Sequence, residues 1–496
     1  MIKLYTLLKT FSREDLKQAK KFLASPYFNT DGHVVKLFDR LCRAYPDMEA
    51  PQLENERLFK FLFPNLKEYD DHKLRNLRSK LTKLLERFLI ENMLQKSPYM
   101  ENKLLVAAYR EAGLFPYFKV AIESGISSLK KAANRGFEYH QEMAWLLHEL
   151  YFHPETPKSN AHRQALFELI GHVEHWFTLQ ALCYSAELDV RQNLYSESMP
   201  SRYKEVVEQL AGEHFGKKSP PVRLLWELSQ TWANPDLKMD FSAYQARLLE
   251  KQQQMGPFPF AIAWKLLIAA GVARSNRGEA GAARELLGLF HAAYDLKLDG
   301  INKSLEVQAF LNCVMAGSHA GEFEWVAAFI KENKAKFSPD IREKVVNLSY
   351  AILYYKQAVL LKDKAFFPEA TDKLAHLQLA DEVLGLTLRP LILRIYYDSM
   401  PVGHPDIRIL FDWCKNAISY FNNHQALAVQ KRKEYKTFVR YVKLLARLKG
   451  QKMPGRRALA NLGAQLGQEQ GTILKHWLVE KLEELKNPSS LDWLQS

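Results

Sequence analysis

A helical repeat is clearest in residues 264–279, which read WKLLIAAGVARSNRGE. Apolar residues recur there every three or four positions and stop at a polar turn that contains Gly278, as in a buried helix that ends at a glycine. The same pattern returns 43 residues later at Gly321, and a third turn, Lys362-Asp363-Lys364-Ala365, places Lys364 another 43 residues on. Three turns at one interval indicate a repeating unit of two helices.

Apolar residues also occupy matching positions before the three turns. Helix pairs of this kind cannot bury their apolar faces alone, so they stack on their neighbours and leave an extended surface. The matching positions lie fourteen, eleven and ten residues before the turn residue, and they hold Trp264, Val307 and Tyr350; Leu267, Phe310 and Leu353; and Ile268, Leu311 and Tyr354.

This pattern resembles the tetratricopeptide-type class of α-solenoid repeats. The period of 43 residues is longer than the tetratricopeptide period of about 34 and lies in the HEAT-like range of about 40–47, so the resemblance is to the architecture rather than to a motif. It implies an all-α fold in which helical hairpins form a right-handed superhelical stack. The alternative is a run of helical hairpins without true repetition.

Helical periodicity extends along the whole chain, and strand signals are nearly absent. The first part should contain a helix capped by Ser12, a helix over 33–44, and an amphipathic helix over 72–94. We expect four parts, which are an N-terminal helical domain (1–95), a helical segment without a clear period (97–255), the hairpin repeats (256–421) and a basic C-terminal helical region (422–496).

The first part also resembles an uncharacterised helical family found in Bacteroidota. The resemblance covers about 95 residues and implies no activity. It rests on Ser25-Pro26-Tyr27-Phe28-Asn29, on VVKLF at 34–38 and on LRNLRSKL at 74–81.

The composition and the lack of a recognisable secretory signal favour a cytoplasmic protein. Of the 496 residues, 47% are hydrophobic and 25% are charged, which suits a globular chain with a large core. The N-terminus lacks the apolar stretch of a secretory signal. The longest apolar run, 261–273, contains Lys265 and is shorter than the about 20 residues that span a bilayer, so we expect no membrane insertion. The cysteines lie too far apart in the sequence to suggest disulfides or a zinc site; they are Cys42, Cys183, Cys313 and Cys414.

Patterns that could support catalysis or metal binding are incomplete. His148 and His153 are five residues apart, which separates them by about 140° around a helix, too far to share one metal ion. Glu168, His172 and His175 share one helical face and are zinc-ligand types, but a solvated surface cluster is the simpler interpretation. Nucleophile-elbow and dinucleotide-binding patterns do not occur. We therefore predict that the protein is not an enzyme and holds no cofactor or metal.

Positive charge is concentrated in one segment. Residues 431–457 hold eleven Lys or Arg against one acid, Glu434, and so carry +10 of the net charge of +13. We assign seven of these cations to an arc of about 100° on one helix, with apolar residues on the remaining circumference. The predicted binding residues for an anionic partner are Arg432, Lys433, Lys436, Arg440, Lys443, Arg447 and Lys449.

Aligned like charges repel by a few tenths of a kcal/mol per pair, so a ridge without interspersed acids indicates an anionic partner. An acidic protein segment would neutralise it, and so would a nucleic-acid backbone, which releases counterions on binding. A solvated face paired with acids of neighbouring helices is the third interpretation. An anionic membrane surface fits less well, because the apolar face is broad enough to be a core face.

Our first hypothesis is a scaffold or adaptor that binds a protein or peptide on the solenoid surface. The alternative is a nucleic-acid-binding protein that uses residues 431–457 with weak sequence preference. In that case the cations of the amphipathic helix over 72–94 would assist; they are Lys73, Lys80, Lys83 and Arg87. The sequence does not indicate the oligomeric state.

Overall fold

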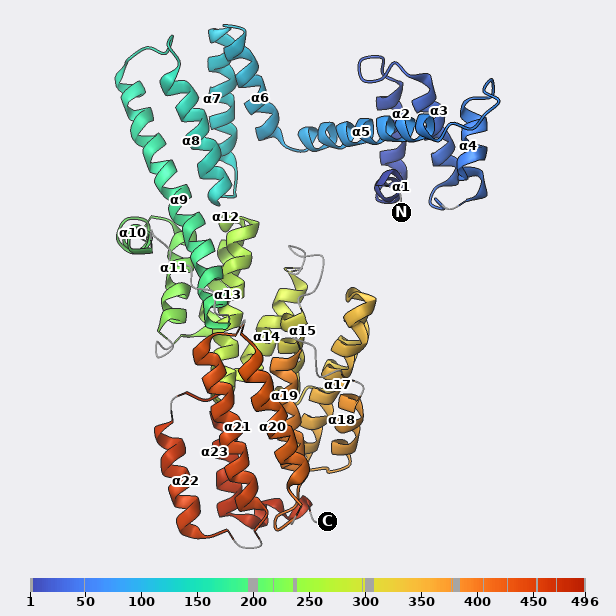
Figure 1. The fold of residues 1–496 in the computed structure, drawn as a ribbon. Coiled ribbons are helices and arrows are strands. Elements are labelled where there is room, and N and C mark those ends of the chain that lie inside the picture. Colours follow the sequence, from blue (N-terminus) through green and yellow to red (C-terminus); the bar gives the residue numbers. More distant parts are fainter. Residues whose placement is uncertain are drawn as a thin grey trace. The chain divides into compact units, whose positions relative to one another are not determined.

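The computed structural model is built from helices joined by short connections (Figure 1). It describes residues 3–48, 50–194, 204–216, 218–234, 239–296, 298, 307–375, 377, 384–404, 406–425, 427–451, 454–469 and 471–494. These residues contain no β-strand. The predicted all-α class is confirmed.

The chain divides into two compact units. The first comprises residues 1–131 and 145–165, and the second comprises residues 132–144 and 166–496. Two long helices, α8 (Phe137–Phe152) and α9 (Asn160–Leu194), contribute to both units. The finer division into four parts remains a prediction.

The first unit begins with helices packed around one apolar core. Ser12 caps α2, because its Oγ accepts the Asp15 N–H at 3.0 Å while the Asp15 carboxylate accepts the Ser12 N–H at 2.8 Å. The helices predicted over 33–44 and 72–94 are also present, as α3 and α5. The helices of this unit before α8 are α1 (Lys3–Lys9), α2 (Arg13–Ala24), α3 (Gly32–Ala44), a 3₁₀ turn (Pro51–Leu53), α4 (Asn55–Leu62), α5 (Asp71–Gln95), α6 (Pro98–Glu111) and α7 (Phe115–Lys131).

In the second unit, helices adjacent in sequence pack against one another, as in stacked hairpins. Its superhelical form remains a prediction. After α9 the order is α10 (Lys204–Gln209), a π-helix (Leu210–Phe215), α11 (Pro220–Ala233), α12 (Phe241–Met255), α13 (Pro257–Asn276), α14 (Ala282–Asp295), α15 (Val307–Ala320), α16 (Phe323–Asn333), a 3₁₀ turn (Lys334–Lys336), α17 (Pro339–Leu361), α18 (Phe366–Ala375), α19 (Gly385–Ser399), α20 (Arg408–Asn423), α21 (Val429–Lys449), α22 (Arg456–Gln468), α23 (Lys475–Lys486) and a 3₁₀ helix (Pro488–Leu494).

The three turns that were aligned in the sequence share one type of helix ending. Gly278 and Gly321 have φ of +74° and +81°, and the third left-handed residue is Lys362 with φ of +54°, two positions before Lys364. After each, the next amide N–H donates to a carbonyl five residues back, which satisfies the last turn of the helix. These bonds are Glu279 to Arg274 at 3.3 Å, Glu322 to Gly317 at 3.0 Å and Asp363 to Ala358 at 3.1 Å.

The apolar positions before these turns contribute to the interior. The position eleven residues before the turn residue is buried in all three hairpins, where it holds Leu267, Phe310 and Leu353. Trp264 and Leu311 are also buried, whereas the remaining four positions are half-buried; they hold Ile268, Val307, Tyr350 and Tyr354.

The apolar helix α13 is longer than the apolar run in the sequence. Among the described helices, it is the one that is long and apolar enough to cross a bilayer, and 39% of its apolar window is buried. Phe260, Trp264 and Leu267 belong to a core cluster, and α13 packs against α11, α12 and α14.

Candidate functional site

The predicted cations lie on α21, which packs against α19, α20 and α23 (Figure 1). One side of α21 belongs to the apolar core that these helices share. The helix spans Val429–Lys449, and Gly450 caps its C-terminus. The residues of α21 that are buried are Phe438, Val439, Tyr441, Val442, Leu445, Ala446 and Lys449.

Six of the seven predicted cations retain exposed surface. Lys433, Arg440 and Arg447 are exposed, whereas the other three are half-buried. We call these six residues the cationic ridge; they are Arg432, Lys433, Lys436, Arg440, Lys443 and Arg447.

Lys449 does not belong to the ridge, and its assignment was wrong. Lys449 has no exposed surface, and its Nζ donates to the backbone carbonyl of Tyr397 at 2.8 Å. The same Nζ lies 4.4 Å from the centre of the Tyr397 ring. Seventeen residues separate it from Arg432, and at 100° per residue this places it about 260° around the helix, on the apolar side. Burial lowers the pKa of Lys449 to about 8.

The ridge has few intramolecular partners. Arg440 pairs with Glu469 at 3.1 Å, and among the described residues it is the one ridge cation in an ion pair. The Nζ of Lys436 donates to Oδ1 of Asn422 at 3.2 Å, and the Arg447 guanidinium lies 5.6 Å from the centre of the Phe411 ring. Apart from Glu469 at Arg440, no acid of a neighbouring helix pairs with a ridge cation in the described part of the chain.

An exposed apolar side chain borders the ridge. Val429 is 71% exposed and lies about 60° around the helix from Arg432, within the arc of the ridge cations. The sequence analysis missed Val429, although its position one turn before Arg432 was a usable signal.

The cations predicted to assist on α5 are partly neutralised in the first unit. Lys80 pairs with Asp31 at 3.0 Å, and Arg87 pairs with Glu91 at 2.7 Å. Lys73 packs over the Phe63 ring, and Lys83 is exposed. These cations are therefore less available to bind an external anion than the ridge cations are.

Comparison with protein-family models, curated proteins and solved structures returned no match. No family is identified for the chain. The resemblances drawn from the sequence therefore go no further than an all-helical protein whose adjacent helices pack together.

The histidines predicted to share one face of α9 meet a third histidine from α8. Nδ1 of His140 lies 2.8 Å from Nδ1 of His172, and the His140 ring stacks on His175 with centres 3.7 Å apart. Nε2 of His175 lies 2.8 Å from Oγ of Ser219, whereas Glu168 is exposed. No group of three His, Cys, Asp or Glu in the described residues is arranged to hold a metal ion.

Two of these imidazoles are neutral at neutral pH. Burial first, and then the charges of the neighbouring histidines, lower the pKa of His140 to about 2 and that of His175 to about 4. His140 and His175 are therefore stacked as neutral rings. Periodicity could not reveal the stack, because His140 is more than 30 residues away in sequence.

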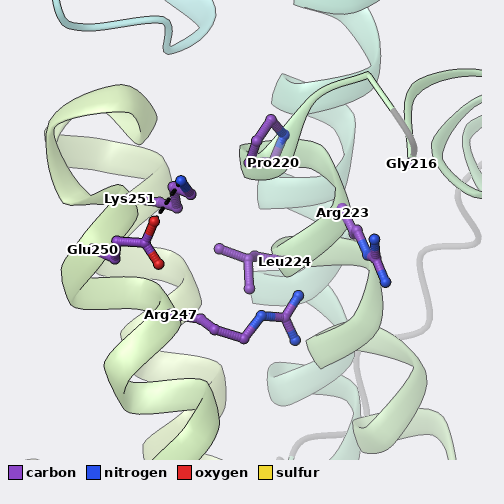
Figure 2. A pocket seen from close by; sticks show the side chains of 7 residues that line it. All are labelled: Gly216, Pro220, Arg223, Leu224, Arg247, Glu250 and Lys251. Carbon is purple, nitrogen blue, oxygen red and sulfur yellow. Dashed lines mark hydrogen bonds and ion pairs between the residues drawn. The ribbon is translucent and has the colours of Figure 1, made fainter.

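A pocket of about 180 Å³ between α11 and α12 is too small and too well neutralised to be a second candidate. Small-molecule sites usually enclose about 300–1,000 Å³. Its lining includes Arg223 and Arg247, both paired with Glu227, and Lys251, which pairs with Glu250 (Figure 2). These pairs use the charges that would bind a ligand.

Proposed function

We propose that this protein is a non-catalytic scaffold or adaptor, whose helical hairpins stack as a right-handed solenoid and whose α21 ridge binds an acidic segment of a protein partner. One observation carries the proposal. Six cations line one face of a helix whose opposite face is core, and one of them is ion-paired within the described residues.

Electrostatics supports an anionic partner on this face. Cations spaced three and four residues apart repel, and α21 cannot turn them away because its apolar side is buried. The pair between Arg440 and Glu469 shows that a protein carboxylate can reach a ridge guanidinium. Further carboxylates from a partner would relieve the repulsion along the remaining ridge.

The surroundings of the ridge favour a protein over a nucleic acid. Val429 offers an exposed apolar contact that suits a segment mixing acidic and apolar residues. The aromatic residues of α21 are not available to stack on bases, since Phe438 and Tyr441 are buried and Tyr435 packs on Phe421 at 4.6 Å. A nucleic acid would have to bind through its backbone alone.

Fluorescence anisotropy tests the proposal. The probes are a labelled peptide that alternates Glu with Leu, the same peptide with Gln in place of Glu, and a generic DNA duplex, each at low and moderate salt. We expect the Glu peptide to bind more tightly than the other two and to weaken as salt rises. Tighter binding of the duplex with a steep salt dependence would establish the nucleic-acid alternative instead.

Matched charge reversals locate the binding. The ridge variant carries Lys433→Glu, Arg440→Glu and Arg447→Glu, and the control variant carries Lys331→Glu, Lys334→Glu and Lys364→Glu, all at exposed positions. The two variants have equal net charge, so only a local effect separates them. The ridge variant should bind the Glu peptide at least about tenfold more weakly, which corresponds to about 1.4 kcal/mol. Equal binding by both variants would show that the ridge is not the site.

A further inference from the structure

The centre of the ridge already has a carboxylate from its own chain. Arg440 lies eight residues after Arg432 and seven before Arg447, and its Nη2 donates to Oε2 of Glu469 at 3.1 Å. Glu469 caps the C-terminal end of α22, which packs on α23, and α23 in turn packs on α21 (Figure 1). The connection between α22 and α23 therefore reaches the ridge at its middle.

Contacts within this connection orient the Glu469 carboxylate. Its Oε1 accepts the Gly471 N–H at 3.1 Å, which leaves Oε2 to face Arg440. The Glu469 N–H donates to the Gln465 carbonyl at 3.1 Å, and the Glu469 carbonyl accepts Nζ of Lys475 at 2.6 Å. The position of the carboxylate therefore does not depend on Arg440 alone.

The same connection also lies against the start of α21. A Cβ on Gly471 would stand 3.5 Å from Nε2 of Gln430, which follows the exposed Val429 in the first turn of this helix. The connection thus approaches α21 at two points, Gln430 and Arg440.

The pair between Arg440 and Glu469 is weak enough to be displaced. Arg440 donates a single hydrogen bond to this carboxylate, whereas the Arg408 guanidinium donates two to Asp406, at 3.0 Å and 2.9 Å. The Arg440 side chain is 59% exposed, and exposed ion pairs shift an equilibrium by about fivefold or less. Carboxylates of a partner can therefore replace Glu469.

Until it is displaced, Glu469 opposes an acidic partner in two ways. A guanidinium that donates to Glu469 has fewer N–H groups left for a second carboxylate. The charge of Glu469 also repels a carboxylate that approaches the adjoining turns of α21, where Lys436 and Lys443 form no ion pair in the ranges that the structure describes. The ridge should therefore bind an acidic segment more weakly than it would without this residue.

We propose that Glu469 is an intramolecular competitor that limits the access of an acidic partner segment to the ridge. This inference rests on the function proposed for α21 and adds a regulatory contact to it. Because Glu469 is tethered, it competes at an effective concentration of about a millimolar or more, which an isolated carboxylate in solution does not match. A segment that also binds Lys436 or Arg447 can displace it.

The variant Glu469→Gln tests the competition by fluorescence anisotropy, with the labelled peptide that alternates Glu with Leu. Glutamine keeps an oxygen that can accept the Gly471 N–H but carries no charge. The variant should bind the peptide about two- to fivefold more tightly than the wild type does. The control, Glu324→Gln at an exposed position of α16, changes the net charge equally and should bind as the wild type does.

The outcomes separate this inference from the function on which it rests. Equal binding by the wild type and Glu469→Gln overturns the competition and leaves the ridge as the site. A gain of the same size in Glu324→Gln also overturns it, since only the net charge would then matter. Absence of binding by all three proteins rejects the ridge as a site for acidic segments, and the competition with it.

A double-mutant cycle identifies the contact that carries the effect. Arg440→Gln removes the guanidinium, so adding Glu469→Gln in that background should bring little or no further gain in affinity. A gain as large as in the wild-type background would show that Glu469 acts only as a nearby charge, and would overturn the role of the pair.

A peptide with a single Glu among Gln residues tests whether several carboxylates are needed. It should bind the wild type at least about tenfold more weakly than the peptide that alternates Glu with Leu, because one carboxylate does not displace Glu469. Equal affinities of the two peptides would contradict the exclusion of single carboxylates.

Discussion

At the scale of single residues, Lys449 holds an ammonium group in the apolar core of the second unit. Burial lowers its pKa to about 8, below the usual value of 10.5. Between these two values the unfolded chain binds a proton that the folded chain does not. The free energy of unfolding should therefore rise with pH in that range, by up to about 1.4 kcal/mol per pH unit from this residue.

The variant Lys449→Met tests this linkage. Urea unfolding at pH 8 and pH 10 should show a smaller rise in stability for the variant than for the wild type, because methionine does not titrate. Near pH 7 the variant should be about as stable as the wild type, since it exchanges one buried hydrogen bond for an apolar contact. Identical pH profiles for the two proteins would contradict the burial of the charge.

The histidine stack predicts a change of stability at acidic pH instead of alkaline pH. The folded pKa of His140 is about 2, and its usual value is 6.5, so only the unfolded chain takes up this proton as the pH falls below 6.5. His140 should therefore cost about 2 kcal/mol of stability between pH 7 and pH 5. His140→Gln should lose less stability than the wild type over this interval. Exposed His404→Gln is the control and should follow the wild type.

At the scale of helices and turns, substitutions at Gly278 and Gly321 allow the cost of backbone strain to be measured separately from that of tertiary packing. Both have left-handed φ, which costs a residue with a Cβ about 1–2 kcal/mol. A Cβ on Gly321 would meet nothing within 4 Å, whereas one on Gly278 would meet Cβ of His476 at 2.6 Å. Gly278→Ala should therefore destabilise the protein more than Gly321→Ala does.

Thermal unfolding of the two variants measures this difference. Adding His476→Gly to Gly278→Ala should recover the excess, because it removes the Cβ that clashes. Equal losses for the two single variants would mean that α23 does not rest on this turn.

At the scale of the whole molecule, α23 joins parts of the second unit that are distant in sequence. His476 contacts Asn276, and Trp477 contacts Asp398. Leu478 is fully buried, whereas Val479 is 40% exposed. Leu478→Ala should cost about 2–5 kcal/mol of unfolding free energy, while Val479→Ala should cost about 1 kcal/mol or less. Chemical denaturation compares them, and similar losses would contradict the docking of α23.

The sequence by itself determined the helices, their hairpin turns and the face of α21 that carries charge. These depend on local properties, namely apolar periodicity, capping by Ser12 and the left-handed preference of Gly278 and Gly321. The third turn has no glycine, so its local signal is weak. The alignment placed its turn residue at Lys364, whereas the left-handed residue is Lys362.

Only the tertiary structure decided which side chains meet across helices. Arg440 pairs with Glu469, and His140 stacks on His175. Such pairs depend on how helices pack, and a residue's neighbours on its own helix do not specify them. Partnering and burial therefore follow from packing, and they determine whether a cation is free to bind an anion.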